Sequence, residues 1–147
     1  MELVEIPLGE YQKKFPKEPH IFISLKYLKL NSQKIESLIC LTPSDKKYKI
    51  GIIAGINKKI IKSPFSAPFG GFHFNKSRIY YSYINNFIIA LKKYIIRYYR
   101  GIDILLPPDY YHYSINTKFI HAMICADFTL KAPEINNWIN LNDYNGN

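Results

Sequence analysis

The stretch with the most unusual chemistry is the segment Ser63-Pro64-Phe65-Ser66-Ala67-Pro68-Phe69-Gly70-Gly71-Phe72. Two prolines restrict its backbone, and the glycine pair permits positive φ and a close approach of another group to the main chain. Backbone N–H groups in such a loop can point at an anion, with Lys76 and Arg78 adding full positive charges. The segment predicts a functional surface at Ser66–Phe72 that leaves Phe69 and Phe72 partly exposed, although a rigid turn with core-filling phenylalanines explains the same composition. The candidate binding residues are Ser66, Phe69, Gly70, Gly71, Lys76 and Arg78.

A second candidate group follows the Pro107-Pro108 pair, in the segment Asp109-Tyr110-Tyr111-His112-Tyr113. Tyrosine and histidine both carry exchangeable protons, so Tyr111 and His112 are the candidate general acid or base. The alternative is an aromatic loop that covers the edge of the core.

The histidines and cysteines show none of the spacings that are typical of metal sites. CxxC and HExxH patterns are both absent, and no metal is expected. Cys40 and Cys125 are expected to be small core residues rather than nucleophiles. The four histidines are His20, His73, His112 and His121.

Charge is distributed unevenly along the 147 residues, whose net charge is +9. Twelve basic residues and no acidic residue lie between Asp45 and Asp103. A block of one sign attracts anions such as nucleic acid, lipid headgroups or a phosphorylated cofactor. Solvated lysines on strand ends and helix backs are the alternative explanation.

The overall composition favours one domain. With 48% hydrophobic and 16% aromatic residues the chain can build one core, and the expected domain spans 1–141 with a polar tail at 142–147. The N-terminus carries Glu2 and Glu5 instead of a secretory signal, and Ile79–Leu91 is too short to cross a bilayer. A cytoplasmic protein without a membrane span is expected.

The first third of the chain predicts one strand and two short helices. Met1–Ile6 alternates as a strand, and Pro7–Lys14 can form a helix with Tyr11 and Phe15 turned inward. Ser24 can cap a second helix that ends near Asn31-Ser32. An antiparallel meander is expected next, with strands at Glu36–Leu41, Tyr48–Ile56 and Lys59–Ser63.

Two helices and two strands are expected after the loop. Ser77 should cap the longest helix, which runs to about Arg100, where Gly101 ends it. Its apolar face comprises Tyr80, Ile84, Phe87, Ile88, Leu91, Ile95 and Tyr98. The remaining elements are a short buried strand at Ile102–Leu106, a helix capped by Asn116 that continues to Ala126, and a last strand at Asn137–Leu141.

The expected fold class is α+β, with a mixed, mainly antiparallel sheet in the order β-α-α-β-β-β-α-β-α-β. This is the order of the GNAT acyltransferase fold. The Ser63–Gly71 loop, preceded by Gly51-Ile52-Ile53-Ala54-Gly55, resembles the first half of bacterial tandem GNAT-type acyltransferases related to the Fem-type aminoacyl transferases. The similarity runs from Met1 to the Asn137–Leu141 strand.

This resemblance implies an N-acyltransferase, or the N-terminal half-domain of one, that acts on a small-molecule amine acceptor with an acyl-CoA or aminoacyl donor. The usual Gln/Arg-x-x-Gly-x-Gly/Ala loop is absent before the long helix, and the second half of such tandem proteins usually holds the donor site. The resemblance therefore also implies a partner, either a second GNAT-like half or a second copy of the chain.

Two other classes of function remain open. A basic module for single-stranded nucleic acid would use the tyrosines for stacking, but RNP, KH and zinc-finger patterns are absent and helical spacing assigns Tyr80 and Tyr98 to the core. Nucleic acid is therefore not the favoured partner. The other class is a non-catalytic structural half-domain.

Overall fold

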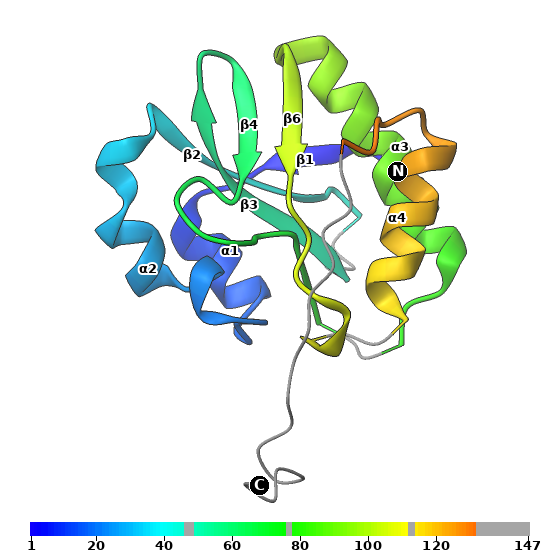
Figure 1. Cartoon of the computed structure of the whole chain (residues 1–147), viewed down its shortest axis with the longest axis horizontal. Helices are drawn as coiled ribbons and strands as arrows, with labels where there is room; N and C mark the ends of the chain where they lie inside the picture. The colour runs from blue at the N-terminus through cyan, green and yellow to red at the C-terminus, as the bar shows by residue number, and fades with distance from the viewer. Residues whose placement is uncertain (46–48, 76–77, 112–113, 132–147) are drawn as a thin grey trace, which may run out of the picture.

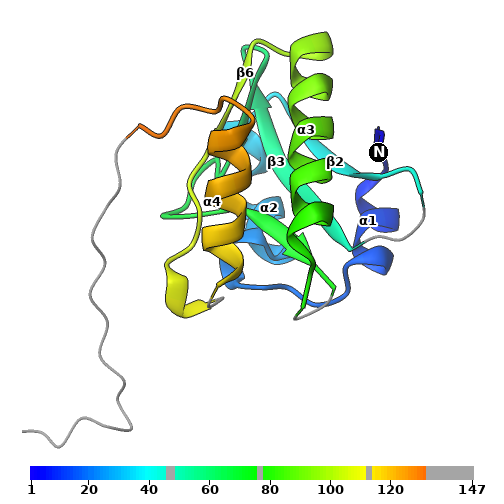
Figure 2. The same ribbon diagram turned by 90° about the vertical axis from the view of Figure 1, so that its right-hand side faces the viewer.

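The computed structural model describes residues 1–45, 49–75, 78–111 and 114–131. In these ranges one mixed sheet has the strand order β1-β2-β3-β4-β6, with β5 also paired to β3. Helices α1 and α2 cover one face of the sheet, and α3 and α4 cover the other (Figures 1 and 2). None of these helices combines the length and the apolar character that crossing a membrane would need. The strands are β1 (Leu3–Glu5), β2 (Ser37–Pro43), β3 (Ile50–Asn57), β4 (Ile60–Ser63), β5 (Phe72–Phe74) and β6 (Gly101–Ile104); the helices are α1 (Leu8–Lys14), α2 (Leu25–Leu30), α3 (Tyr81–Tyr98) and α4 (Ile115–Cys125).

The predicted meander is confirmed. β2 pairs antiparallel with β3, and β3 with β4 through a hairpin in which Ile56 lies opposite Ile61. The turn consists of Lys58 and Lys59, with φ of 50° and 63°. Positive φ at both turn residues is the geometry that matches the twist of a two-residue hairpin. The predicted α+β class with a mostly antiparallel sheet is therefore correct.

The two predicted N-terminal helices are also confirmed. Tyr11 and Phe15 are buried at the first of them. Ser24 caps α2, because its side chain accepts a hydrogen bond of 3.3 Å from the backbone N–H of Tyr27. Three-residue 3-10 helices at Ile21–Ile23 and Ser32–Lys34 flank α2.

Strand β3 separates two hydrophobic layers. Ile52 and Ala54 belong to the core under α3 and α4, while Ile53 packs with the residues of α1 and α2. Gly51 shares the α1 face with Ile53, since alternate residues of a strand point to one side. A Cβ at Gly51 would lie 2.7 Å from both the Phe15 ring and the Tyr11 hydroxyl oxygen. This glycine is what permits α1 to lie directly on the sheet.

Gly51→Ala is expected to lower the free energy of unfolding by about 1–3 kcal/mol, because the added methyl group overpacks a closed layer. Gly9→Ala is the matched control: nothing lies within 4 Å of its Cβ position, on α1. Alanine there should stabilise the helix by roughly 0.5–1 kcal/mol. Urea unfolding of both variants measures the contrast, and equal effects would contradict the packing of α1 on β3.

The long helix differs from its prediction at both ends. It begins at Tyr81 rather than at Ser77, which lies outside the described residues, and Tyr80 precedes it with extended backbone angles. Tyr80 is 83% and Tyr98 is 51% exposed, so neither belongs to the core. Helical spacing fails for Tyr80 because that residue is not helical, and Tyr98 lies in the last turn. The five central residues of the predicted face are buried: Ile84, Phe87, Ile88, Leu91 and Ile95.

The region after α3 brings three further corrections. β6 is shorter than expected and only half buried, because it borders the described sheet and pairs only with β4. Asn116 does not cap α4; it lies inside the helix, where its side-chain amide donates a hydrogen bond of 2.7 Å to the Pro107 carbonyl. Cys125 is exposed, whereas Cys40 is buried as expected. The predicted strand at Asn137–Leu141 and the tail lie outside the described residues.

Candidate functional site

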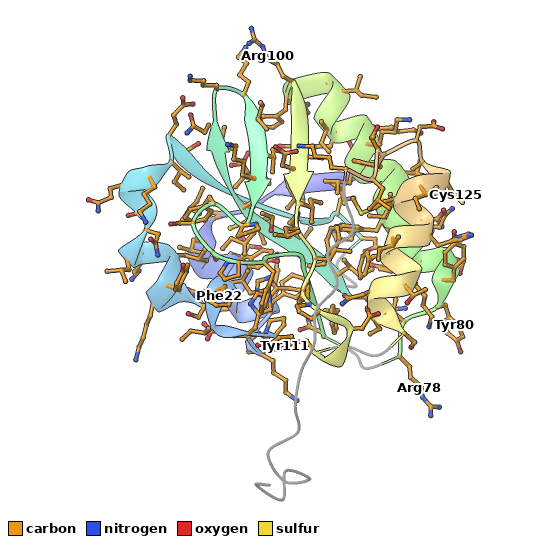
Figure 3. All side chains as sticks on the ribbon, in the orientation of Figure 1. Phe22, Arg78, Tyr80, Arg100, Tyr111 and Cys125 are labelled. Carbon is orange, nitrogen blue, oxygen red and sulfur yellow. The ribbon has the colours of Figure 1, made fainter. Side chains whose placement is uncertain are left out.

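The β4–α3–β6 unit brings Arg78 and Tyr111 to one end of the molecule. β4 and β6 are parallel, with Ile60 opposite Gly101 and Ser63 opposite Ile104. A helix that connects two parallel strands runs back alongside them, so its N-terminus lies near the carboxyl ends of the strands. In Figure 3 Arg78, which precedes α3, and Tyr111 both lie toward this end, opposite Arg100. Open sheets commonly bind ligands outside the carboxyl ends of parallel strands.

The predicted loop is inserted between β4 and β5, two strands that pair one after the other with the same strand, β3. Gly55 pairs with Lys62, whereas Ile52, three residues earlier in β3, pairs with Phe72, ten residues later. Seven residues are therefore inserted between β4 and β5. Strand β5 was not predicted, because the loop was expected to continue through Phe72, which is the first residue of this three-residue strand. Phe72 is only 5% exposed, so the expectation that its ring would be partly exposed is wrong.

A tight neck closes the loop. The N–H of Gly71 donates a 3.0 Å hydrogen bond to Ser63 Oγ, and the N–H of Gly70 donates one of 2.8 Å to the Leu105 carbonyl. Gly71 has a φ of 101°, a conformation that side chains strongly disfavour. A Cβ at Gly70 would lie 2.7 Å from the backbone N of Pro64. Both glycines are thus required by the neck itself.

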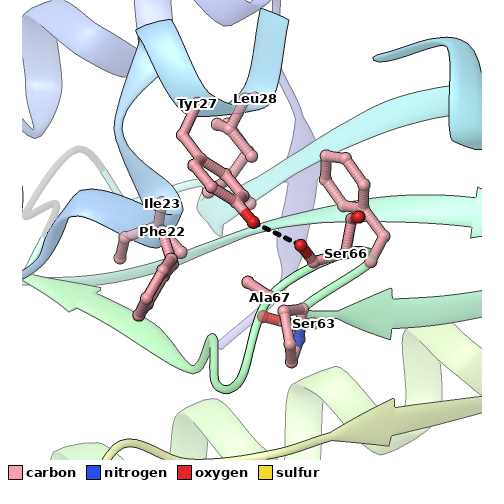
Figure 4. A pocket seen from close by; sticks show the side chains of 10 residues that line it. Phe22, Ile23, Tyr27, Leu28, Ser63, Ser66 and Ala67 are labelled. Atoms are coloured by element: carbon pink, nitrogen blue, oxygen red, sulfur yellow. Dashed lines mark hydrogen bonds between the residues drawn. The ribbon is translucent and has the colours of Figure 1, made fainter. Parts of the chain in front are cut away.

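The tip of the loop is held by hydrogen bonds from α2 and from the 3-10 helix that follows it. The Tyr27 hydroxyl donates a hydrogen bond to the Ser66 carbonyl, as Figure 4 shows, and Lys34 Nζ donates one of 2.7 Å to Ser66 Oγ. A hollow of about 220 Å³, its open mouth included, lies between the loop and α2. Its walls include Phe22, Ile53 and Phe65. Ser66 is therefore engaged in holding the loop in place.

His20 lies at the centre of an aromatic cluster that joins the loop to the end of β6. Its ring centroid is 4.9 Å from that of Phe69 and 5.9 Å from that of Tyr111, and Phe22 packs on both His20 and Phe69. His20 Nε2 is 2.9 Å from the Gly70 carbonyl oxygen. Since a carbonyl only accepts, Nε2 carries the proton and Nδ1 holds a lone pair.

The chemistry available to His20 follows from this tautomer. Nδ1 is buried and has no hydrogen-bond partner in the described part of the chain. Burial lowers the pKa of His20, and the hydrogen bond to Gly70 opposes that shift. The ring is therefore neutral at neutral pH and can accept a proton at Nδ1. Tyr111, which is 37% exposed, packs on this ring and also reaches solvent.

The structure brings together only some of the predicted site residues. Phe69, Gly70 and Tyr111 meet around His20, and Ser66 lies on the α2 side of the same loop. Arg78 is exposed before α3. His112 and Lys76 lie outside the described residues. His20 itself carried no signal in the sequence, because its contact with Gly70 joins positions fifty residues apart.

A second basic group lies at the opposite end of the sheet. The N–H of Arg100 donates a 2.8 Å hydrogen bond to the Lys59 carbonyl, which ties the end of α3 to the β3–β4 hairpin. Lys58, Lys59 and Arg100 are exposed there, and Arg97 stacks on the exposed Tyr98 with its guanidinium carbon 5.2 Å from the ring centroid.

Comparisons with known proteins supply no family for this chain. A scan against family models, a search of curated proteins and a search of solved structures found no match. In the described ranges no group of three or more His, Cys, Asp or Glu residues is placed to hold a metal ion.

Proposed function

We propose that this chain is a GNAT-type acyltransferase domain that transfers an acyl or aminoacyl group to a small-molecule amine, with acyl-CoA or an aminoacyl donor. The observation that carries the proposal is the β4–α3–β6 unit. It provides one parallel pair in an otherwise antiparallel sheet, and the ladder between the two strands stops where the loop is inserted. In GNAT proteins the donor enters where two such strands separate.

The residues at this end fit one part of an acyl-CoA. The first turn of α3 contains no acidic residue, and the N–H groups of Tyr81 and Ser82 have no partner among the described residues, whereas those of Tyr83 and Ile84 donate to the Tyr80 carbonyl. The two free N–H groups are available to phosphate, with Arg78 exposed before the helix. The acyl part fits less well: the hollow beside the loop and a second one between α1, α2 and the sheet lie on the α1 and α2 side, and the walls of these two hollows include no residue of β6. We therefore assign completion of the donor site to a second GNAT-like half or a second copy.

The amine nitrogen would form a bond to the carbonyl carbon of the donor while the bond from that carbon to the thioester sulfur, or to the ester oxygen, breaks. The protein would hold the amine in place and accept its proton, and the leaving thiol or alcohol takes up a proton. Positioning of two reactants can account for much of the rate of such a transfer. Tyr111 and His20 are two proton-exchanging groups at this end: Tyr111 is exposed, and the neutral His20 ring in contact with it has a lone pair at the buried Nδ1. Proton transfer is assigned to this pair.

Calorimetric titration of the full chain with acetyl-CoA tests the proposal. Micromolar binding is expected at protein concentrations at which copies associate. Arg78→Glu should weaken it about tenfold or more, because it places a negative charge beside the phosphates. Arg97→Glu, at the opposite end, is the charge-matched control and should bind normally. Absence of heat at every protein concentration would contradict the proposal and favour a structural half-domain.

The basic group at the far end of the sheet supports one alternative, a module for single-stranded nucleic acid. Tyr98 is exposed beside Arg97, as base stacking would require. The Arg97→Glu/Arg100→Glu variant is then expected to lose binding to a fluorescent oligothymidylate, and the parent's affinity should fall steeply with salt. Binding that is absent, or insensitive to salt and to both substitutions, would remove this alternative.

A further inference from the structure

A hollow separate from the loop lies between α1, α2 and the sheet. Its volume is about 360 Å³, including the open mouth. Most of its wall residues are apolar, but polar groups provide nearly half of the exposed wall surface; the polar wall residues are Tyr11, Gln12, Glu18 and His73. The apolar wall residues include Leu8, Phe15, Ile23, Leu25, Leu28 and Ile53.

His73 of β5 lies on the sheet side of this hollow. Its ring is 3% exposed and is held by Tyr11, whose hydroxyl is 2.9 Å from Nδ1. The rings of Tyr11 and Phe15 pack on it at centroid distances of 5.3 and 5.9 Å. His73 lies opposite Gly51 in the β3–β5 ladder, and the missing side chain there leaves space for both aromatic rings.

The second ring nitrogen of His73, Nε2, makes no hydrogen bond within the described part of the chain. Nδ1 makes the ring's hydrogen bond with Tyr11, and Nε2 has no partner among the described residues. Nε2 is not among the fully buried polar atoms that lack a partner, so it is open to the hollow that His73 lines, and a ligand there can form the hydrogen bond that the described fold does not provide. Because the Tyr11 hydroxyl can donate or accept at Nδ1, Nε2 can take the complementary role toward a ligand.

We propose that this hollow binds a small, uncharged, largely apolar molecule whose single hydroxyl or carbonyl group forms a hydrogen bond with His73 Nε2. An anionic ligand is disfavoured because no cation lines the hollow, and the carboxylate in its walls, that of Glu18, already accepts a hydrogen bond of 3.0 Å from the backbone N–H of Leu25. The site lies on the opposite face of the sheet from α3 and α4 and is independent of the proposed acyl transfer (Figure 1).

Phenol and toluene are suitable probes because they share one ring and differ by a hydroxyl and a methyl group. NMR of the full chain, with ¹⁵N-labelled histidine and ¹³C-labelled methyl groups, is expected to show saturable phenol shifts at His73 and at Ile23, Leu25 and Leu28. Phenol should bind about five- to tenfold more tightly than toluene, the effect of one hydrogen bond. Absence of saturable shifts, or shifts confined to other sites, would overturn the proposal.

Three variants locate the site. His73→Phe should bind both probes equally, while His121→Phe, on the exposed surface of α4, should retain the preference for phenol. Leu25→Phe should fill the hollow and weaken the binding of both probes. This variant tests whether the probes bind in the hollow even if His73→Phe does not fold. A phenol preference that survives in folded His73→Phe, or undiminished binding in Leu25→Phe, would contradict the assignment.

Discussion

Acidification is expected to lower the free energy of unfolding by roughly 3 kcal/mol between pH 7 and pH 4, with His73 as the main cause. Burial, with a smaller contribution from His20, lowers the pKa of His73 to about 3. The unfolded chain therefore binds a proton below about pH 6.5 that the folded chain does not bind. The stability contribution is complete above that pH and is lost progressively toward the folded-state pKa.

Urea unfolding at a series of pH values measures this dependence. His73→Asn removes the titrating ring while keeping a polar side chain beside Tyr11, and its stability should change much less with pH. His121→Asn, which removes an exposed histidine of α4, should leave the steep dependence of the parent in place. A parent-like pH dependence in His73→Asn would show that His73 is not the buried, neutral group described.

The second large effect is expected at the neck of the loop. Gly70→Ala should lower the free energy of unfolding by about 2–3 kcal/mol, because its Cβ would meet backbone atoms of Ser63 and Pro64 at 2.7 Å and these cannot move aside cheaply. Gly71→Ala should cost about 1–3 kcal/mol through its positive φ. Gly101→Ala is the control, because nothing lies within 4 Å of its Cβ position.

Chemical denaturation of these variants measures the effect. Because both glycines are structurally required, a test of the function of the loop needs a substitution elsewhere in it. Valine at both neck glycines would disturb the fold, so it cannot separate binding from stability. Phe69→Ala leaves the neck intact and alters the half-buried ring beside His20 and Tyr111. If Gly70→Ala were as stable as the parent, the neck would not be closed as described.

Local patterns predicted most of the elements of the fold. The apolar strand β3, its hairpin with β4 and the Ser24 cap depend on neighbours in sequence, and each is present. The core positions in the middle of α3 follow from helical spacing alone. These features are encoded within windows of a few residues, so a single sequence is enough to reveal them.

Apart from the ends of α3, the main failures involve contacts between distant segments. Asn116 has the residue type of a helix cap, yet its partner is the Pro107 carbonyl at the end of the β6 segment. Strand β5 has three residues and exists because β3 extends past β4 to receive it. His20 becomes a candidate only through Gly70, and His73 only through Tyr11. Propensity and periodicity contain no information on such pairings.

The neck between Ser63 and Gly71 separates the loop, whose length can vary, from the strands β4 and β5, whose lengths must stay constant. One extra residue inside β4 or β5 would turn every following side chain to the opposite face. Residues added between positions 64 and 69 would leave the ladders on either side in register, because the strands before and after the loop pair with the same strand. The loop can therefore be exchanged for a segment of different length and sequence while the strands on either side keep their pairing.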